Sequence, residues 1–378
     1  MPKIVLIGAG SGFGSRLSVD LLSYPELQDS TLALVDIDEQ AMEGVTNFVQ
    51  RVVKHHDLPA TVIGTTDRRE VLKDADFVVV SIAVGGPAYN GVPYYHEVTI
   101  PRKYGVDQIV ADTVGPGGVF RTLRTAPEML AICRDMEELC PGALCLNYTN
   151  PMAMLTWAMN EVSTVPTVGL CHSVQGTHGQ LCGYIGLEFD DARSWVAGIN
   201  HMSWFLRFEK ARGEDEGEDL YPRLREAMEN PRIYKRDPVR FEILRHFGYF
   251  VTESTRHMSE YVPYFRKTTE LMQRFGLESR HPTPDGGRAH RVWQDDIPDG
   301  GPIEEDALKL RRSKEYASGI IHACWTNTLY RFNGNVPNQG LITNLPQGCC
   351  VEVPCYVDRN GIQPCHVGDL PPQLAGVI

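Results

Sequence analysis

Two polar segments of this chain carry side chains that could bind one metal ion together. Cys171 is followed by His172, and His201 lies further along in Gly198-Ile199-Asn200-His201. A thiolate and an imidazole are ligands of late transition metals, so zinc is the first expectation from these residue types. His172, beside the thiolate, titrates near neutral pH and could donate or accept a proton. Taken singly, such residues are more often structural, because a lone cysteine is commonly buried in a core.

A second segment, Gly8-Ala9-Gly10-Ser11, has the pattern of a nucleotide-binding turn. Glycine at this point lets the backbone approach a pyrophosphate. Asp36 ends the next expected strand, where its carboxylate could accept hydrogen bonds from ribose hydroxyls and would repel a 2′-phosphate, which favours NAD over NADP. The third glycine of the dehydrogenase pattern falls at Phe13, with Gly12 and Gly14 on either side, so the fingerprint is imperfect. A tight turn without a ligand is the alternative.

Three further residues have side chains suited to acid–base chemistry or binding. Asn150 follows an expected strand and faces the same crevice as the glycine turn. Asp112 precedes a glycine-rich bend, and it is either a turn residue or a carboxylate that tunes a base. Tyr261 could act as a base only if a nearby charge lowers its pKa. The carboxyl ends of neighbouring strands would bring these groups together.

The first half of the chain alternates apolar strand-like segments with helical ones. Strands are expected at 3–7, 32–36, 61–64, 76–81 and 143–147, and helices at 12–23, 39–53 and 123–139. This alternation predicts an α/β fold with a Rossmann-like, doubly wound parallel sheet covered by helices on both faces. Ligands of such sheets bind at the carboxyl ends of the strands.

The second half is expected to be α+β. Strands are predicted at 195–198, 204–208 and 349–357, helices at 238–245 and 303–328, and a long loop at 280–301. The sequence therefore predicts an NAD-binding domain over residues 1–170 and a metal- and substrate-binding domain over residues 171–378.

Composition excludes several other classes of protein. The net charge of −12 over 378 residues argues against nucleic-acid binding, which needs clustered Lys and Arg. The longest apolar stretch, 77–84, is too short to span a bilayer, so no membrane association is expected. Met1 runs almost directly into the first strand without a signal peptide. Ten cysteines without such a signal indicate a reducing, cytoplasmic location.

Taken together, five motifs resemble the NAD- and metal-dependent glycosidases of glycoside hydrolase family 4. They are Gly8–Ser11, Asp112–Gly118, Asn147–Pro151, Cys171–Val174 and Gly198–His201, and the resemblance continues through 248–254, 344–353 and 360–364 to about residue 374. Cys-His-Ser-Val resembles the α-galactosidase branch. Phospho-glucosidases have Cys-Asp or Cys-Asn there and a phosphate-binding Arg after the fourth strand, whereas 86–101 contains no Arg. The α-galacturonidase branch has Cys-His-Glu.

The resemblance implies an unusual mechanism, which departs from the two-carboxylate scheme of most glycosidases. NAD takes a hydride from C3 of the sugar, and a divalent metal ion, generally Mn²⁺ in this family, polarises the oxygens at C2 and C3. A base then removes the C2 proton, the group at C1 leaves, water adds, and the hydride returns. The metal would be held by Cys171 and His201.

The resemblance also assigns roles to the other polar residues. His172 takes the place of the proton donor, Asn150 contacts the sugar, and Asp112 matches the position that raises the basicity of the base. Tyr261 is the expected base, with Tyr264 and His257 as alternatives, and His257 is alternatively a third metal ligand.

An α-galactoside is the expected substrate, and a homo-oligomer, dimer or tetramer, is the expected assembly. An α-glucosidase or α-galacturonidase of the same family is the nearest alternative. An ordinary NAD-dependent hydroxy-acid dehydrogenase would accumulate NADH and need no thiolate-bound metal, and a non-catalytic NAD-sensing protein would need none of these polar residues. The family usually continues with a helical C-terminal segment beyond the point that corresponds to Ile378, so that part is expected to be shortened.

Overall fold

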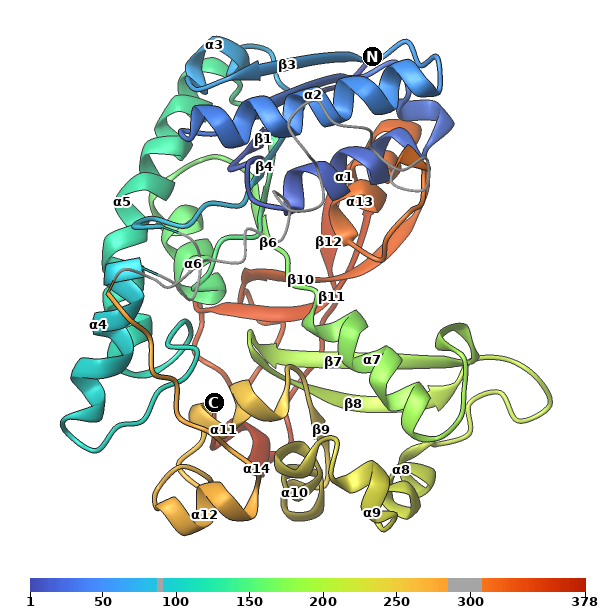
Figure 1. The fold of residues 1–378 in the computed structure, drawn as a ribbon. Helices are drawn as coiled ribbons and strands as arrows, with labels where there is room; N and C mark the ends of the chain where they lie inside the picture. The colour runs from blue at the N-terminus through green and yellow to red at the C-terminus, as the bar shows by residue number, and fades with distance from the viewer. Residues whose placement is uncertain (87–90, 285–307) are drawn as a thin grey trace.

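The computed structural model describes residues 1–86, 91–284 and 308–378, and its centre is a single mixed sheet (Figure 1). Six parallel strands form one side of it, in the order β3-β2-β1-β4-β5-β6. They are β1 (Lys3–Ile7), β2 (Thr31–Val35), β3 (Thr61–Thr65), β4 (Phe77–Val80), β5 (Leu144–Asn147) and β6 (Thr167–Gly169). This is the strand order of a doubly wound nucleotide-binding sheet.

Both faces of the central parallel strands β1, β2 and β4 are buried, as their apolar sequences require, whereas the edge strand β3 is partly exposed. In β1, Ile4 and Leu6 pack on one face against α1 (Phe13–Leu22), α2 (Glu39–His55) and α13 (Tyr316–Thr326). Val5 and Ile7 alternate to the other face. There they meet α3 (Arg69–Leu72), α5 (Gly115–Leu139) and α6 (Met152–Val162).

The antiparallel strands extend the same sheet from β6. They are β7 (Ala192–Ile199), β8 (Met202–Lys210), β9 (Phe250–Val251), β10 (Tyr330–Pro337), β11 (Cys350–Asp358) and β12 (Gly361–Pro364). The order continues β6-β10-β11-β7-β8-β9, with β12 paired to β11. Asn335 of β10 pairs with Gly169 of β6, and Glu352 of β11 pairs with Gly198 of β7. Strands from the end of the chain thus join its two halves.

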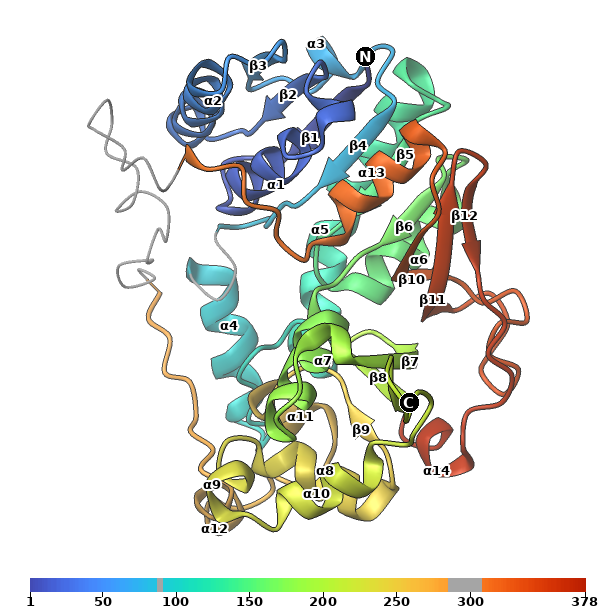
Figure 2. The same ribbon diagram turned by 90° about the vertical axis from the view of Figure 1, so that its right-hand side faces the viewer.

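Further helical elements complete the described structure (Figures 1 and 2). They are α4 (Gly91–Arg102), α7 (Ser173–Tyr184), α8 (Tyr221–Met228), α9 (Pro231–Tyr234), α10 (Pro238–Phe247), α11 (Thr255–Tyr261), α12 (Thr269–Arg274), α14 (Pro372–Ala375) and the 3₁₀ turns η1 (Pro25–Leu27) and η2 (Phe189–Asp191). Among the described helices, none is long and apolar enough to cross a membrane.

The predicted α/β, Rossmann-like fold is confirmed, but the helix predicted over 303–328 is wrong in part. Residues 309–315 are not helical, and α13 begins only at Tyr316. The buried carboxylate of Asp20 accepts hydrogen bonds from the backbone N–H of Ser313, at 2.7 Å, and from its hydroxyl. Arg312 also donates to the carbonyl of Ser23, at 3.1 Å. These contacts hold the segment against α1, and helix propensity does not outweigh them.

Two other predictions have no structural outcome. Residues 303–307 and the part of the predicted loop from 285 to 301 lie outside the described residues. The division into domains at 170/171 stays a prediction.

Candidate active site and metal centre

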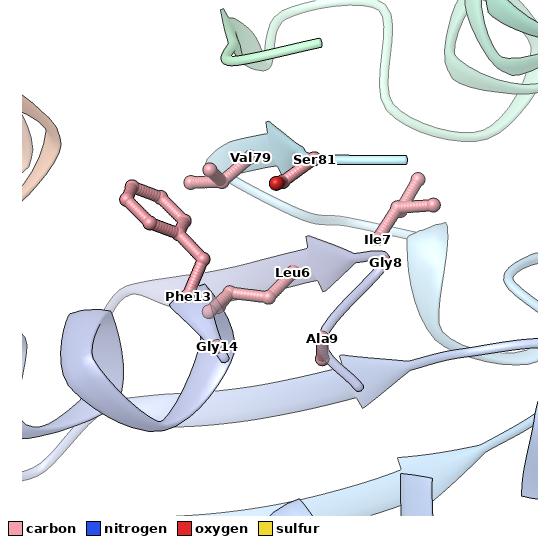
Figure 3. A pocket seen from close by; sticks show the side chains of 8 residues that line it. All are labelled: Leu6, Ile7, Gly8, Ala9, Phe13, Gly14, Val79 and Ser81. Atoms are coloured by element: carbon pink, nitrogen blue, oxygen red, sulfur yellow. The ribbon is translucent and has the colours of Figure 1, made fainter. Parts of the chain in front are cut away.

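The glycine turn directly follows β1 and leads into α1, as predicted, and Gly8 lies beside Ser81 after β4 (Figure 3). A small pocket opens beside it, lined by Leu6, Ile7, Gly8, Ala9, Phe13, Gly14, Val79 and Ser81. Gly8 has a φ of +85°, and a Cβ there would lie 2.0 Å from the carbonyl oxygen of Ser81. A Cβ on Gly14 would lie 2.2 Å from the carbonyl oxygen of Ala9. Gly14 therefore provides the close helix packing for which the pattern reserves position 13.

Asp36 directly follows β2 and faces the glycine turn. Its Oδ2 accepts a hydrogen bond from the backbone N–H of Gly10 at 2.8 Å, and its Oδ1 accepts one from Asp38 at 3.0 Å. The hydroxyl of Ser11 donates to the carbonyl of Gly8 at 2.7 Å. The turn is a tight backbone cradle next to an acidic residue, and this geometry fits the pyrophosphate and ribose of NAD.

We expect Gly10→Ala to weaken NAD binding at least about tenfold. A Cβ on Gly10 would lie 2.8 Å from Oδ2 of Asp36 and 2.7 Å from the Cβ of Ala41, so the carboxylate or α2 would have to move. Titration calorimetry with NAD measures the effect. Gly44→Ala in α2 is the matched control, because a Cβ there meets nothing within 4 Å. Equal NAD affinity in the two variants would contradict this role of the turn.

The metal candidates come together at the edge of the sheet where the parallel strands β1 and β6 both end. Cys171 follows β6 after one residue, and His201 lies in the turn between β7 and β8. Glu253, which the sequence reasoning missed, follows β9 and lies beside both. Its Oε1 is 3.9 Å from Sγ of Cys171 and 3.8 Å from Nε2 of His201. The site is possible because β10 and β11 bring β6 within reach of β7, β8 and β9.

Hydrogen bonds around His201 show which of its nitrogens is free for a metal. Oγ1 of Thr113 lies 2.7 Å from Nδ1 of His201 and donates its one proton to Oδ1 of Asp112 at 2.9 Å. Thr113 must therefore accept from Nδ1–H. In the neutral ring Nε2 then carries a lone pair, and it faces Cys171 and Glu253. A partner on the second ring nitrogen is usual for a metal-binding histidine.

The electrostatics of this centre attract a cation. Burial favours the neutral form of His201, but its interactions with Cys171 and Glu253 outweigh burial and raise its pKa to about 10. Burial also opposes ionisation of Asp112, yet His201, His257 and Arg121 together lower the pKa of this carboxyl. A divalent ion would supply the positive charge that the site otherwise takes from a proton on His201.

Tyr261 lies in the same site, at the end of α11. Its hydroxyl is 3.4 Å from Oδ1 of Asp112 and 3.3 Å from Oγ1 of Thr113, and its ring stacks against that of His201 with 6.3 Å between centroids. Burial, followed by the charge of Asp112, raises the pKa of Tyr261 well above its usual value. Tyr264 is 45% exposed and lies on the surface.

The side chain of His257 lies next to Ser254 and Glu253. Its Nδ1 lies 2.7 Å from Oγ of Ser254 and 3.5 Å from Oε2 of Glu253. Burial lowers the pKa of His257. The ring thus borders the metal candidates through Glu253.

His172 directly follows Cys171 in the chain, and Asn150 lies between β5 and α6. The side chain of His172 is 71% exposed, and its Nδ1 lies 3.9 Å from Oε1 of Glu315. Oδ1 of Asn150 is buried and has no hydrogen-bond partner among the described residues. A buried acceptor without a partner is costly. It is therefore suited to receive a hydroxyl of a bound ligand.

Comparison with known proteins identifies the family. The family models described as "Family 4 glycosyl hydrolase" and "Family 4 glycosyl hydrolase C-terminal domain" match residues 3–187 and 196–378. The chain belongs to glycoside hydrolase family 4. The resemblance inferred from the motifs is confirmed, and this family 4 chain is a glycosidase.

Two relatives and one solved structure illustrate the likeness. An α-galactosidase of Bacillus subtilis (strain 168) is 41% identical and an α-galactosidase of Rhizobium meliloti (strain 1021) is 38% identical. The alignments cover 100% and 95% of this chain, and 86% and 74% of the relatives. A 6-phospho-α-glucosidase from gut microorganisms, solved with NAD and Mn²⁺, superposes with a TM-score of 0.75 at 21% identity, over 100% of this chain and 86% of its own. This last likeness shows the fold alone.

The residues singled out from the sequence of this family 4 member separate into two neighbourhoods. Gly8, Gly10 and Ser11 form the glycine turn with Asp36 beside it, whereas Cys171, His201, Asp112 and Tyr261 form the metal centre. His172 directly follows Cys171 in the chain, and Asn150 follows β5. The missed residue, Glu253, lies in the motif 248–254. No chemical role for Glu253 could be predicted from this motif, because an acidic residue after a two-residue strand has no periodic signal.

Proposed function

We propose that this family 4 chain hydrolyses terminal α-galactosides by an oxidation–elimination mechanism, with NAD and Mn²⁺ as cofactors. The observation that carries the proposal is the meeting of Cys171 and His201 with the Tyr261–Asp112 pair at one edge of a sheet that also carries the glycine turn. Plain hydride transfer needs no thiolate ligand, whereas acidification of a C–H bond next to a carbonyl gains from a Lewis acid. The α-galactosidase relatives support the choice of sugar.

NAD would bind at Gly8, Gly10, Ser11 and Asp36 and supply reversible hydride transfer at C3, and a divalent ion at Cys171 and His201 would supply a Lewis acid for the sugar oxygens. Side chains of the protein carry out the remaining steps, which take place at C2 and at C1 of the sugar.

At C2, Tyr261 removes the proton and Asp112 orients its hydroxyl. The pKa of a buried tyrosine beside a carboxylate is too high for this role without help, and the positive charge of the metal would lower it. At C1, His172 donates a proton to the departing oxygen. Its exposure is consistent with a place where the aglycone enters and leaves. Asn150 binds a sugar hydroxyl through its buried Oδ1.

We expect the enzyme to place deuterium at C2 of released galactose when nitrophenyl α-galactoside is cleaved in D₂O with NAD, Mn²⁺ and a thiol reductant. Removal of the C2 proton by a side-chain base, followed by return of a proton from solvent, exchanges that position. NMR or mass spectrometry of the sugar measures the label. Release of galactose without label at C2 would refute the elimination mechanism.

The same assay separates the alternative functions. Cleavage of α-glucoside or α-galacturonide in preference to the galactoside would move the chain to another branch of the family. Net accumulation of NADH, followed at 340 nm, would favour a hydroxy-acid dehydrogenase.

A cytoplasmic location and a homo-oligomeric assembly, dimer or tetramer, are also proposed. All ten cysteines are free thiols, and a reducing compartment preserves the Cys171 thiolate as a ligand. Light scattering on the purified chain measures its mass in solution and tests the oligomer.

A further inference from the structure

Glu253 has no role in the reaction as described above, although its carboxylate lies beside both metal candidates. Among the residues that the structure describes, Cys171, His201 and Glu253 form the one group of three possible metal ligands, with all three donor atoms within 4.8 Å of one another. Ligand atoms bound about 2.1–2.3 Å from a common ion lie about 3–4.5 Å apart. The separations of 3.9 Å and 3.8 Å from Oε1 of Glu253 fall in this range. The separation from His201 is also too long for a hydrogen bond.

The backbone of Glu253 is held in an unfavourable conformation. Its φ is +74°, in the left-handed region that favours glycine. A non-glycine residue persists there only when its surroundings hold it. On one side, Thr252 donates its N–H to the carbonyl of Ser203 at 2.8 Å. On the other side, the Ser254 side chain caps α11. The carboxylate is thus aimed by fixed neighbours on both sides.

A buried ion pair is linked by hydrogen bonds to the backbone of Glu253. Arg240 and Asp237 are about 1% exposed and pair with each other at 2.5 Å. Arg240 donates to Oγ1 of Thr177 at 3.1 Å, and Thr177 in turn donates to the carbonyl of Glu253 at 3.4 Å. Asp237 accepts from the hydroxyl of Thr255 at 2.5 Å. Hydrogen bonds from α10 and α7 therefore hold the strained backbone of Glu253 in place. This support indicates that the position of its carboxylate is functional.

The charges of the group favour a dication. A thiolate and a carboxylate carry two negative charges in a largely buried place, where Cys171 is 5% exposed and the side chain of Glu253 is 13% exposed. Two buried like charges at this distance are unfavourable without a compensating cation. The imidazole of His201 is neutral as a ligand, so the three side chains together carry a charge of −2. This charge balances an ion of charge +2. A carboxylate oxygen is also the hardest of the three donors, which favours Mn²⁺ over softer ions.

We infer that Glu253 is a third protein ligand of the divalent metal ion, and that its left-handed backbone places Oε1 opposite Cys171 and His201. The inference rests on the proposed function, because it requires the same ion. It also accounts for the contact with His257, which orients the second carboxylate oxygen, at 3.5 Å, and need not itself bind the ion.

The test measures Mn²⁺ binding directly, without substrate. Metal-free enzyme is titrated with Mn²⁺, and the free ion is followed by electron paramagnetic resonance for the wild type, Glu253→Gln, Glu253→Gly and Cys171→Ser. We expect Glu253→Gln to raise the Kd for Mn²⁺ at least about tenfold. Glu242→Gln is the matched control, because Glu242 is 15% exposed and contacts Tyr234, Arg245 and His246 instead.

Glu253→Gly separates ligation from folding. Glycine relieves the strain at φ +74°, so the metal-free variant should melt at or above the wild-type Tm. Mn²⁺ should nevertheless raise its Tm far less than it raises that of the wild type, because the ion stabilises only the state that binds it. This outcome would support ligation even if Glu253→Gln folds poorly.

The failures of the two proposals are distinguishable. Wild-type Mn²⁺ affinity in Glu253→Gln and Glu253→Gly, together with loss of affinity in Cys171→Ser, would overturn the role of Glu253 alone. Unchanged affinity in all three variants, or absence of binding by the wild type, would overturn the metal centre and the inference together.

Discussion

Cys171→Ser should lower kcat/KM for an α-galactoside by at least about 10³-fold, which corresponds to about 4 kcal/mol of transition-state stabilisation. The change replaces the thiolate that faces His201 and Glu253 with a neutral hydroxyl of nearly the same size. The ion would lose an anionic ligand, whereas packing around this buried position would change little. Steady-state kinetics at saturating Mn²⁺ and NAD measure the loss, and a melting curve verifies the fold.

Cys365→Ser is the control for the chemistry of the substitution. Cys365 is a free, partly exposed cysteine whose backbone N–H pairs with Pro354, outside the metal centre. Its variant should retain wild-type activity. If Cys171→Ser also retained wild-type activity, the thiolate would not be a metal ligand.

Tyr261→Phe should lower kcat by about 10²- to 10⁴-fold, the range that positioned acid–base groups contribute. The substitution removes the hydroxyl that lies near Asp112 and Thr113 and leaves the ring stacked on His201. Mn²⁺ and NAD should bind as in the wild type, so the loss should appear in kcat more than in KM. The labelling of C2 in D₂O should fall in parallel.

Tyr264→Phe distinguishes between the candidate bases. Tyr264 is 45% exposed, so its hydroxyl should be dispensable. Loss of C2 exchange in Tyr264→Phe or in His257→Gln, with exchange intact in Tyr261→Phe, would reassign the base.

The parallel half of the fold follows closely from the sequence. Uniformly apolar segments such as residues 77–80 can only be strands buried on both faces, and the glycine turn after Ile7 fixes where α1 begins. The extended segment before Tyr316 does not follow from local pattern, because the contacts of Asp20 with Ser313 join residues about 290 positions apart. Propensity contains no information about such pairing.

Several residues of the candidate site could be named from the sequence, but their geometry could not. Cys171, His201 and Asp112 lie in motifs of the family, and Tyr261 was the expected base, with Tyr264 and His257 as alternatives. Their distances depend on strand pairings that appear nowhere in the local sequence. Glu253 illustrates this most clearly, because the position of its carboxylate depends on a left-handed backbone and on contacts across three elements.

The position of β10 and β11 between β6 and β7 has a consequence for how the enzyme is made. Every named metal candidate lies before residue 258, yet the strands that join β6 to β7 lie between Tyr330 and Asp358. During synthesis, chain emerges from the ribosome N-terminus first, so the parallel half can fold early. We expect the nascent chain to acquire a competent metal centre only once residues 330–358 have emerged, and a chain that stops before Tyr330 should bind NAD but not Mn²⁺.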